Sequence, residues 1–262
     1  MPDKIHVRVA AAVCLALLGL AAAAARAADS PAAIAAAVAA GGRPDADVKR
    51  DVLRKPAATL AFAGVKPGDA IGELLPGGGY YTRLLSVLVG PAGHVYALAP
   101  PRPTDASPDT PDFAARVKAI AADPHYSNVS VVQEPLTDIV FPNPLDLVWT
   151  SQNYHDFHNV PQLDIDAFNR QVFAALKPGG VYLILDHAAA SGSADRDTST
   201  LHRIDPQLVK KEVLAAGFVL EASSDLLRRA DDPHTAAVFD PGIRGKTDQF
   251  VLKFRKPASA RQ

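Results

Sequence analysis

The stretch IGELLPGGGYYTRLL, residues 71–85, places three consecutive glycines between a short apolar run and the first turns of a predicted helix. Glycines that follow a strand let backbone N–H groups approach a ligand without an intervening side chain. The start of the next helix favours polar or anionic groups, because its first N–H groups have no partner inside the helix. The stretch therefore predicts a ligand site at the junction of a strand and a helix.

Two kinds of nucleotide-binding loop fit these residues poorly. A mononucleotide P-loop requires Gly-Lys-Ser/Thr after the turn, where this chain has Tyr80, Tyr81 and Thr82. A dinucleotide-binding loop would use Gly77 and Gly79, but Thr82 stands where a third small residue belongs. The acid expected about twenty residues later is also missing. The residues thus argue against the first loop and give the second only weak support.

Strand-like and helix-like segments alternate along most of the chain. Strands are expected at 70–75, 95–98, 129–132, 145–149, 181–185, 218–222 and 249–254. Helices are expected at 80–88, 113–121, 165–176 and 206–216. Alternation of this kind predicts a parallel sheet covered by helices on both faces. No strong helix separates the last two strands, so the prediction is a seven-stranded, mostly parallel α/β sheet with an antiparallel last strand.

The first residues indicate export. Lys4 and Arg8 precede an apolar run that ends in Ala25-Arg26-Ala27, a small-x-small cleavage pattern. Residues 1–27 are therefore predicted to be a signal peptide, with an uncleaved anchor as the alternative. Cys14, the only cysteine, lies within this segment, so the mature chain would have no thiol. We expect an exported, periplasmic protein with no stable membrane span after cleavage.

The sequence ELLPGGG, residues 73–79, resembles the first motif of class I S-adenosylmethionine-dependent methyltransferases. That motif has an acid, a hydrophobic residue and then Gly-x-Gly-x-Gly. Gly77 and Gly79 match its second and third glycines on either side of Gly78, whereas Leu75 replaces the first, which is expected to reshape the turn. Glu73 matches the acid that helps hold the methionine end of the cofactor. The resemblance continues through HVYALAP (94–100), VSVVQEPLTDIVFPNPLDLVW (129–149) and LKPGGVYLILD (176–186).

The chain after residue 27 is most similar to a group of bacterial exported proteins described as predicted methyltransferases. The resemblance implies a Rossmann-like methyltransferase domain at 65–257, accessory helices at 28–64, a disordered tail at 258–262 and S-adenosylmethionine as cofactor. It places Glu134 near the adenine. Ala99 occupies the usual position of the acid that binds both ribose hydroxyls, and a methyl group accepts no hydrogen bond. Either Asp105 takes over this role, cofactor affinity is lowered, or the ligand differs.

The segment WTSQNYHDFHN, residues 149–159, follows the fourth strand, where the resemblance implies residues that contact cofactor and acceptor. Methyl transfer mainly requires a positioned acceptor and, where needed, a group that removes its proton. A histidine suits that task near neutral pH. We expect His155 or His158 to be the base, with Tyr154 and Asn153 as positioning groups. The alternative is that these residues only brace a loop.

A second hypothesis is a catalytically degenerate, exported methyltransferase-fold protein that binds a small ligand or a divalent metal. His155, His158, His187 and His202 could converge at one edge of the sheet, with carboxylates from Asp156 and Asp186. No pair of them has a strict metal-binding spacing, so no metal ligand is assigned from sequence.

Further expectations concern partners, surfaces and the position of Trp149. The net charge of −1 lacks the basic excess that nucleic-acid binding needs, so a small-molecule acceptor is expected and oligomeric state is not predicted. Arg50, Asp51 and Arg54 are expected to form a solvated ion-pair face. The long connection at 223–248 is expected to be functional or mobile, and Trp149 to lie beside the ligand crevice.

Overall fold

The structure is a computed structural model that describes residues 31–102, 107 and 112–258. The predicted signal peptide, Asp105 and residues 259–262 of the predicted tail lie outside these residues. None of the described helices is both long enough and apolar enough to cross a membrane.

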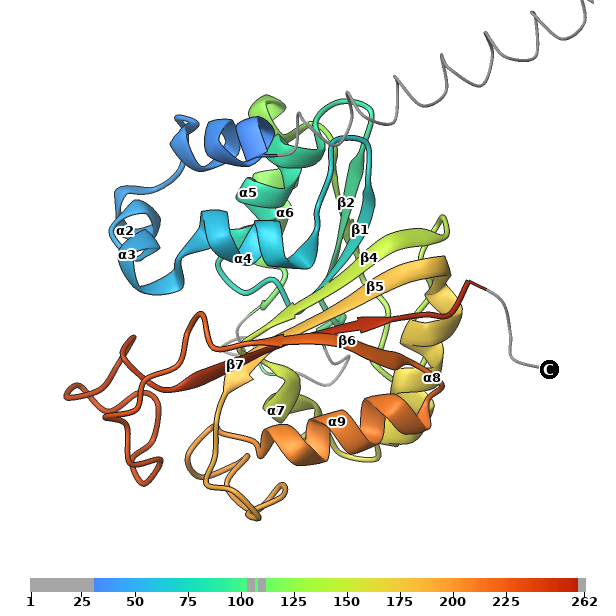
Figure 1. Ribbon diagram of the computed structural model, residues 1–262. Helices are drawn as coiled ribbons and strands as arrows, with labels where there is room; N and C mark the ends of the chain where they lie inside the picture. The colour runs from blue at the N-terminus through green and yellow to red at the C-terminus, as the bar shows by residue number, and fades with distance from the viewer. Residues whose placement is uncertain (1–30, 103–106, 108–111, 259–262) are drawn as a thin grey trace, which may run out of the picture.

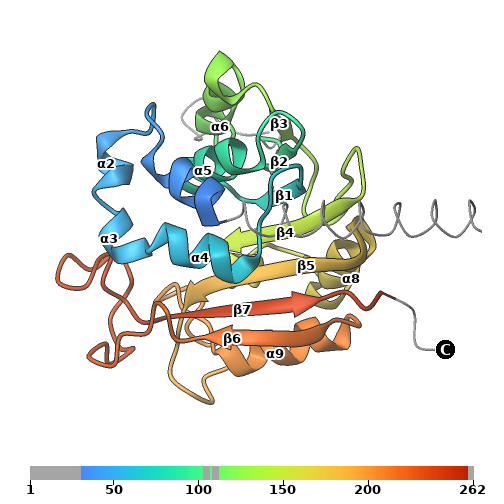
Figure 2. The ribbon, with the colours of Figure 1, turned by 45° about the horizontal axis from the view of Figure 1, so that its top comes forward.

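Seven strands form one sheet in the order β3-β2-β1-β4-β5-β7-β6 (Figure 2). The strands are β1 (Ala70–Leu74), β2 (His94–Leu98), β3 (Val129–Val132), β4 (Leu145–Ser151), β5 (Leu176–His187), β6 (Val219–Ser224) and β7 (Gln249–Arg255). The first five strands pair in parallel, and β7 runs antiparallel to both β5 and β6. The predicted sheet is confirmed. Because the chain moves from one side of β1 to the other between β3 and β4, a ligand crevice is expected where β1 and β4 end.

Helices cover both faces of the sheet, as Figure 1 shows. One face carries α4 (Pro56–Ala63), α5 (Tyr80–Val89) and α6 (Ala115–Ala121). The other carries α7 (Tyr154–Phe157), α8 (Ile165–Ala175) and α9 (Pro206–Ala215). Sequence analysis did not foresee α7, a single turn inside the polar segment after β4.

Alternating side chains of the central strands divide the core into two layers. On β4, Trp149 belongs to the layer under α5, whereas Val148 packs with α8 and α9. This follows from the pleat, which points successive side chains to opposite faces. The Trp149 ring is fully buried, with its centroid 4.5 Å from that of Tyr81.

The N-terminal helices are tied to the start of α5. They comprise residues 31–39, α2 (Asp45–Val48), α3 (Asp51–Arg54) and α4. Arg43 donates two hydrogen bonds to Asp51, at 2.6 and 2.8 Å, and the Tyr80 hydroxyl donates to the same carboxylate at 2.6 Å. Asp51 is thus a structural anchor, which holds α3 against the helix that follows the glycines.

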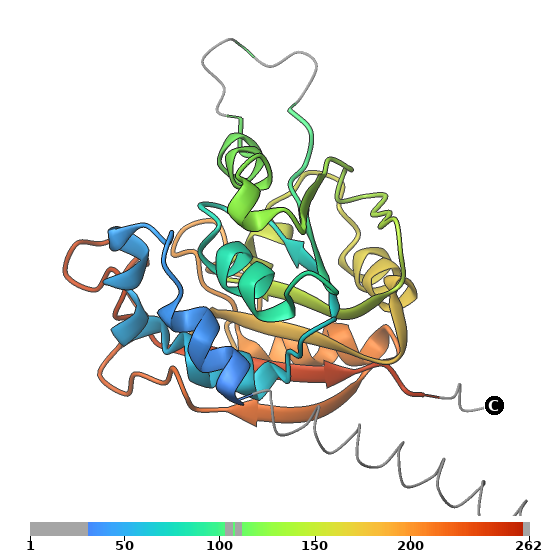
Figure 3. The same ribbon diagram turned by 90° about the horizontal axis from the view of Figure 1, so that it is seen from above.

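The long connection between β6 and β7 is held in place at both ends. Arg203 pairs with Asp232 in two hydrogen bonds, and Asp248 accepts from the ring of His234 at 3.0 Å. The Lys55 ammonium donates to the Leu226 carbonyl at 2.8 Å, so the connection lies beside the α3–α4 junction (Figures 1 and 3). The Lys55 contact fastens the connection to the N-terminal helices, and Arg203 fastens it to the segment between β5 and α9.

Gly79, at the start of α5, lacks room for a side chain. Its φ is 75°, and an added Cβ would lie 2.0 Å from Cδ1 of Ile120 on α6. We predict that Gly79→Ala lowers the free energy of unfolding by about 2–4 kcal/mol, through overpacking and left-handed strain. Chemical denaturation measures the change.

Gly78→Ala is the matched control, because its Cβ would meet nothing closer than the Arg116 guanidinium at 3.7 Å. We expect this control to change stability by less than about 1 kcal/mol. Equal losses in both variants would contradict the packing argument.

Candidate functional site

A cavity of about 1310 Å³ opens at the carboxyl ends of β1 and β4. Its wall is built from the glycine segment, the N-terminal helices and the segments that follow β2, β3 and β4. Leu75 and Tyr80, the residues best placed to block it, form part of the wall and leave the cavity open. The fold thus places a ligand-sized space at the position that the strand order favours.

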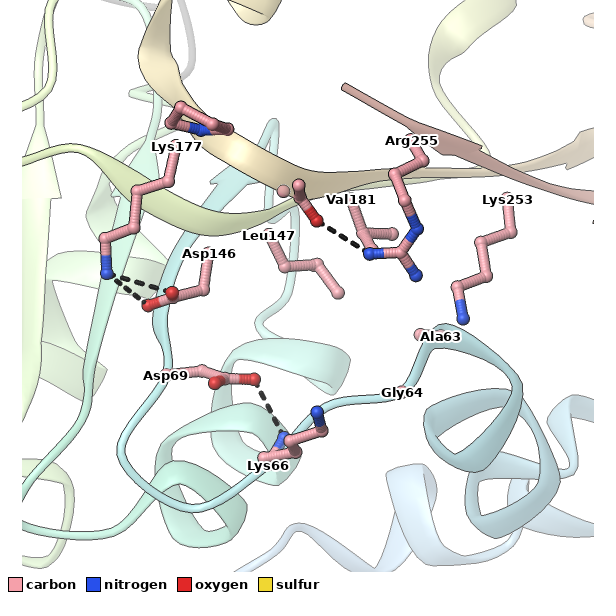
Figure 4. A pocket seen from close by; sticks show the side chains of 13 residues that line it. Ala63, Gly64, Lys66, Asp69, Asp146, Leu147, Lys177, Val181, Lys253 and Arg255 are labelled. Atoms are coloured by element: carbon pink, nitrogen blue, oxygen red, sulfur yellow. Dashed lines mark hydrogen bonds and ion pairs between the residues drawn. The ribbon is translucent and has the colours of Figure 1, made fainter. Parts of the chain in front are cut away.

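A smaller cavity of about 320 Å³ lies at the opposite edge of the sheet (Figure 4). Most of its charged side chains are paired within the protein. Lys177 contacts Asp146 at 2.8 Å, and Lys253 contacts Glu221 at 3.0 Å. It has no glycine-rich strand-to-helix junction, so the larger cavity is the candidate site.

The glycine segment keeps a left-handed turn even where a glycine has been replaced. Leu75 has a φ of 49°, which costs a side-chain-bearing residue about 1–2 kcal/mol and glycine very little. The Asn153 amide donates to the carbonyls of Leu74 and Leu75, at 3.0 and 2.9 Å. Asn153 is 6% exposed. It lines the cavity, but its amide N–H groups are directed to the turn, which makes it a support for the glycine segment.

The three glycines differ in role. Gly77 and Gly78 line the cavity, and a Cβ on Gly77 would meet no atom within 4 Å. Their bare backbone therefore faces open space that a ligand would occupy. Gly79 is not among the described lining residues and is needed for packing against α6. Of the three glycines expected to contact a cofactor, Gly77 and Gly78 line the cavity and Gly79 is not among the described lining residues.

Two opposite charges reach the cavity wall beside the glycines. Glu73 is buried and accepts a hydrogen bond from the Thr82 hydroxyl at 2.6 Å. Burial raises its pKa to about 7. Arg54 also lines the cavity, and burial lowers the pKa of its guanidinium. Its side chain stacks 4.5 Å from the centroid of the Tyr80 ring and donates to Gln152, and no carboxylate among the described residues forms an ion pair with it.

Arg54 corrects the sequence interpretation of this helix. A solvated ion-pair face was expected, but Arg54 points into the cavity and Asp51 is used by Arg43 and Tyr80. Arg50 and Asp47 also line the cavity. Sequence reasoning missed Arg54 and Gln152 as site residues. The signal for Gln152 was its place in the segment 149–159 after the fourth strand, whereas no local pattern of the sequence marks Arg54 as a site residue.

The wall beyond β2 and β3 is mostly apolar. Ala99 is 2% exposed and lines the cavity, with a methyl group where the resemblance implies an acid. Pro135 and Leu136 line it after β3, whereas Glu134 itself is not among the described lining residues. Asp112 is a described acid on the same wall. The ribose partner implied by the resemblance is therefore absent at position 99.

Tyr154 and His158 lie away from the cavity, contrary to their expected roles at an acceptor. The Tyr154 side chain is fully buried in the other layer of the core, and its hydroxyl contacts Glu212 at 3.0 Å and Asn169 at 2.8 Å. His158 contacts the same Glu212 carboxylate at 3.3 Å. The single turn of α7 directs both side chains towards α9, so neither faces a ligand in this cavity.

His155 is held in a buried ion pair. Its Nδ1 lies 2.9 Å from Oδ1 of Asp186, a fully buried carboxylate, and its Nε2 lies 3.3 Å from Asp156. Burial alone would lower the pKa of His155, but the two carboxylates raise it to about 10. A protonated imidazolium does not take up a proton, so the expected role of His155 as a free base does not fit this arrangement. Of its neighbours, Asp156 lines the cavity.

Trp149 lies behind the cavity wall. Tyr81 lines the cavity, and the Trp149 ring packs on its inner side. Trp149 was expected to lie beside the crevice, but the side chain of Tyr81 separates it from the cavity.

Glu73→Gln tests the buried acid. Unfolded Glu73 ionises near pH 4.5 but the folded carboxyl only near 7, so its burial lowers stability progressively between these pH values and fully above 7. Glutamine keeps an acceptor for Thr82 and carries no charge. We predict a gain of about 2–3 kcal/mol in unfolding free energy at pH 8 that shrinks towards zero at pH 4.5. Urea denaturation at both pH values measures it, and a gain independent of pH would contradict the ionisation argument.

Comparisons with known proteins bear on the fold. No family model matches the chain, and no curated protein matches it by sequence. A solved methyltransferase from Aquifex aeolicus that depends on S-adenosylmethionine (SAM) superposes with a TM-score of 0.57 at 17% identity, over 79% of this chain and 93% of that chain. Another SAM-dependent methyltransferase, from Mesorhizobium loti, gives 0.54 at 16% identity, over 79% and 99%.

The cyclase SpnF is also similar in structure, with a TM-score of 0.55 at 16% identity, over 84% of this chain and 86% of that chain. Proteins with different activities thus share this architecture, and identities of this size show the fold alone. The fold expected from the glycine motif is confirmed. The chain has the fold of the class I SAM-dependent methyltransferases.

Proposed function

We propose that this chain binds SAM in the large cavity and transfers its methyl group to a small-molecule acceptor. The observation that carries the proposal is that Glu73 and Arg54 line the same cavity as the bare backbone of Gly77 and Gly78. An anion and an unpaired cation at one end of a cavity are complementary to the ammonium and carboxylate of an amino-acid tail. The methionine end of this cofactor is such a tail.

The cavity fits the rest of the proposal. Its volume of about 1310 Å³ exceeds the ~300–1000 Å³ usual for a single small-molecule pocket, which leaves room for a cofactor and an acceptor. Pro100, Pro101 and Leu136 give apolar contacts on the β2 and β3 side. The Ser151 hydroxyl at the end of β4 is buried and has no hydrogen-bond partner among the described residues.

Different parts of the cavity wall would bind the cofactor and the acceptor. When bound, the cofactor supplies an electrophilic methyl group on its sulfonium. Glu73 and Arg54 would hold the amino-acid tail against the glycine backbone, and the segment after β4 would contact the acceptor. Asn153 keeps that segment fastened to the turn. Positioning accounts for most of what such a transfer needs from a protein.

The cellular location belongs to the proposal. Residues 1–27 support an exported, periplasmic protein, and the cofactor would have to be available there.

Arg54→Gln tests the complementarity. We predict that the wild-type chain binds S-adenosylhomocysteine and that Arg54→Gln weakens this binding about 10–100-fold, because a charged hydrogen bond contributes about 1.5–3 kcal/mol. Binding of 5′-methylthioadenosine, which lacks the amino-acid tail, should change less than about threefold. Titration calorimetry with both ligands measures the difference.

Arg170→Gln, an exposed arginine on α8, is the matched control and should bind both ligands like the wild type. A wild-type chain that binds neither S-adenosylmethionine nor S-adenosylhomocysteine would refute the proposed function. Equal losses for both ligands in Arg54→Gln would refute the assigned role of the arginine.

Gly78→Ala tests the bare backbone. Its methyl group would project from the cavity wall without disturbing the packing, so stability should be retained. We predict at least a tenfold loss of S-adenosylhomocysteine affinity, since the added group occupies the space of the ligand. Calorimetry on this variant checks the prediction, and unchanged affinity would place the ligand elsewhere.

A further inference from the structure

Three potential metal ligands meet beside the cavity, apart from the residues proposed for the cofactor. His155 and Asp156 come from α7, and His202 from the segment between β5 and α9. The Asp156 carboxylate lies 3.3 Å from Nε2 of His155 and 3.8 Å from Nδ1 of His202. One ligand atom from each residue lies within 4.8 Å of the others. Ligand atoms around a tetrahedral ion with bonds of ~2.1 Å are separated by ~3.4 Å, so small side-chain movements would close the site.

A buried carboxylate orients one of these histidines. Oδ1 of Asp186 lies 2.9 Å from Nδ1 of His155, and Oδ2 accepts from the His155 backbone N–H at 2.8 Å. Asp186 is inaccessible to solvent. The ring is therefore fixed with Nε2 directed to Asp156. In metal sites, the ring nitrogen of a histidine that does not bind the metal usually donates a hydrogen bond to a carboxylate or a carbonyl group.

The third ligand, His202, has an unfavourable backbone conformation. His202 has a φ of 55°, in the left-handed region, and side-chain-bearing residues are kept there when the surrounding structure requires it. Its ring lies 5.5 Å from the His155 ring and 4.8 Å from that of Phe239. These contacts place the imidazole in the cluster, with its side chain 33% exposed.

We propose that His155, Asp156 and His202 form a site for a divalent transition-metal ion, which displaces the proton from Nε2 of His155 into solvent when it binds, with Asp186 as the positioning residue behind His155. Two imidazoles and one carboxylate, without a thiolate, suit zinc and its first-row neighbours better than calcium or magnesium. Three protein ligands leave at least one coordination position open, as in catalytic rather than structural sites.

The site borders the large cavity through Asp156, whereas His155 and His202 are not among the described lining residues. Asp156 lines that cavity and its side chain is 42% exposed, whereas the His155 side chain is 3% exposed. An oxygen or nitrogen atom of a molecule in the cavity would therefore have access to the ion. This step rests on the proposed function and assigns the acceptor class as a small molecule with a metal-binding oxygen or nitrogen atom.

Metal titration of the chelator-treated, untagged chain tests the site. We expect one Co²⁺ per chain by calorimetry, a visible absorption of coordinated Co²⁺ and its loss when Zn²⁺ is added. His202→Asn, which tolerates the left-handed backbone, and Asp156→Asn should each weaken Co²⁺ binding at least ~10-fold. His125→Ala removes an exposed histidine on another face and serves as the control with unchanged binding. Circular dichroism confirms that each variant is folded.

Two outcomes would overturn the site: a folded wild-type chain that binds no Co²⁺ or Zn²⁺, or binding that both His202→Asn and Asp156→Asn leave unchanged. S-Adenosylhomocysteine is titrated separately into the metal-free protein, so the two proposals fail independently. Nucleoside binding without metal binding would refute the metal site alone. Metal binding lost in both variants, without nucleoside binding, would support the site and refute the proposed function.

Discussion

The Asn153 amide fastens the glycine segment to the end of β4. It donates to the carbonyls of Leu74 and Leu75, across the point where the strand order reverses. Asn153 links the turn to the segment after β4, while the Leu75 N–H donates to the Leu98 carbonyl at 2.9 Å and Arg83 donates to the Gly78 carbonyl at 3.0 Å. Leu75 holds a left-handed conformation that leucine avoids, so the turn needs such a restraint more than a glycine-containing turn would. The cavity wall at Gly77 and Gly78 depends on it.

The N-terminal helices complete the other side of the cavity. Asp51 is the centre of their attachment, because Arg43 and the Tyr80 hydroxyl both donate to it. Tyr80 in turn supports Arg54, which stacks on its ring. A residue near the N-terminus is thus positioned through the helix that follows the glycines. The accessory segment is part of the site, although it precedes the first strand of the sheet.

The sequence predicted the sheet and helices well because their signals are local. Apolar strands alternate with helices, and Pro56 and Gly64 mark the ends of α4 as such residues usually do. The roles of the site side chains depend on contacts between segments that are far apart in the sequence. No local sequence pattern contains that information. Tyr154 and His158 were expected at the cavity, but the single turn of α7 points them to Glu212 on α9. Arg54 was expected in solvent, and only the fold of α2 to α4 over α5 places it in the cavity.

The charged forms of Glu73 and Arg54 are stabilised only in part by the folded chain. Burial raises the pKa of Glu73 to about 7 and lowers the pKa of Arg54, so each charged form is disfavoured by its surroundings. The attraction of Arg54 lowers the pKa of Glu73, but the effect of burial is larger. A zwitterionic tail between them would supply both missing partners in a site where water is already partly excluded. The charged forms of Glu73 and Arg54 are therefore unfavourable in the empty cavity, and a bound zwitterionic tail would stabilise both. Local arrangements that are unfavourable without a ligand are expected at binding sites rather than in a well-packed core.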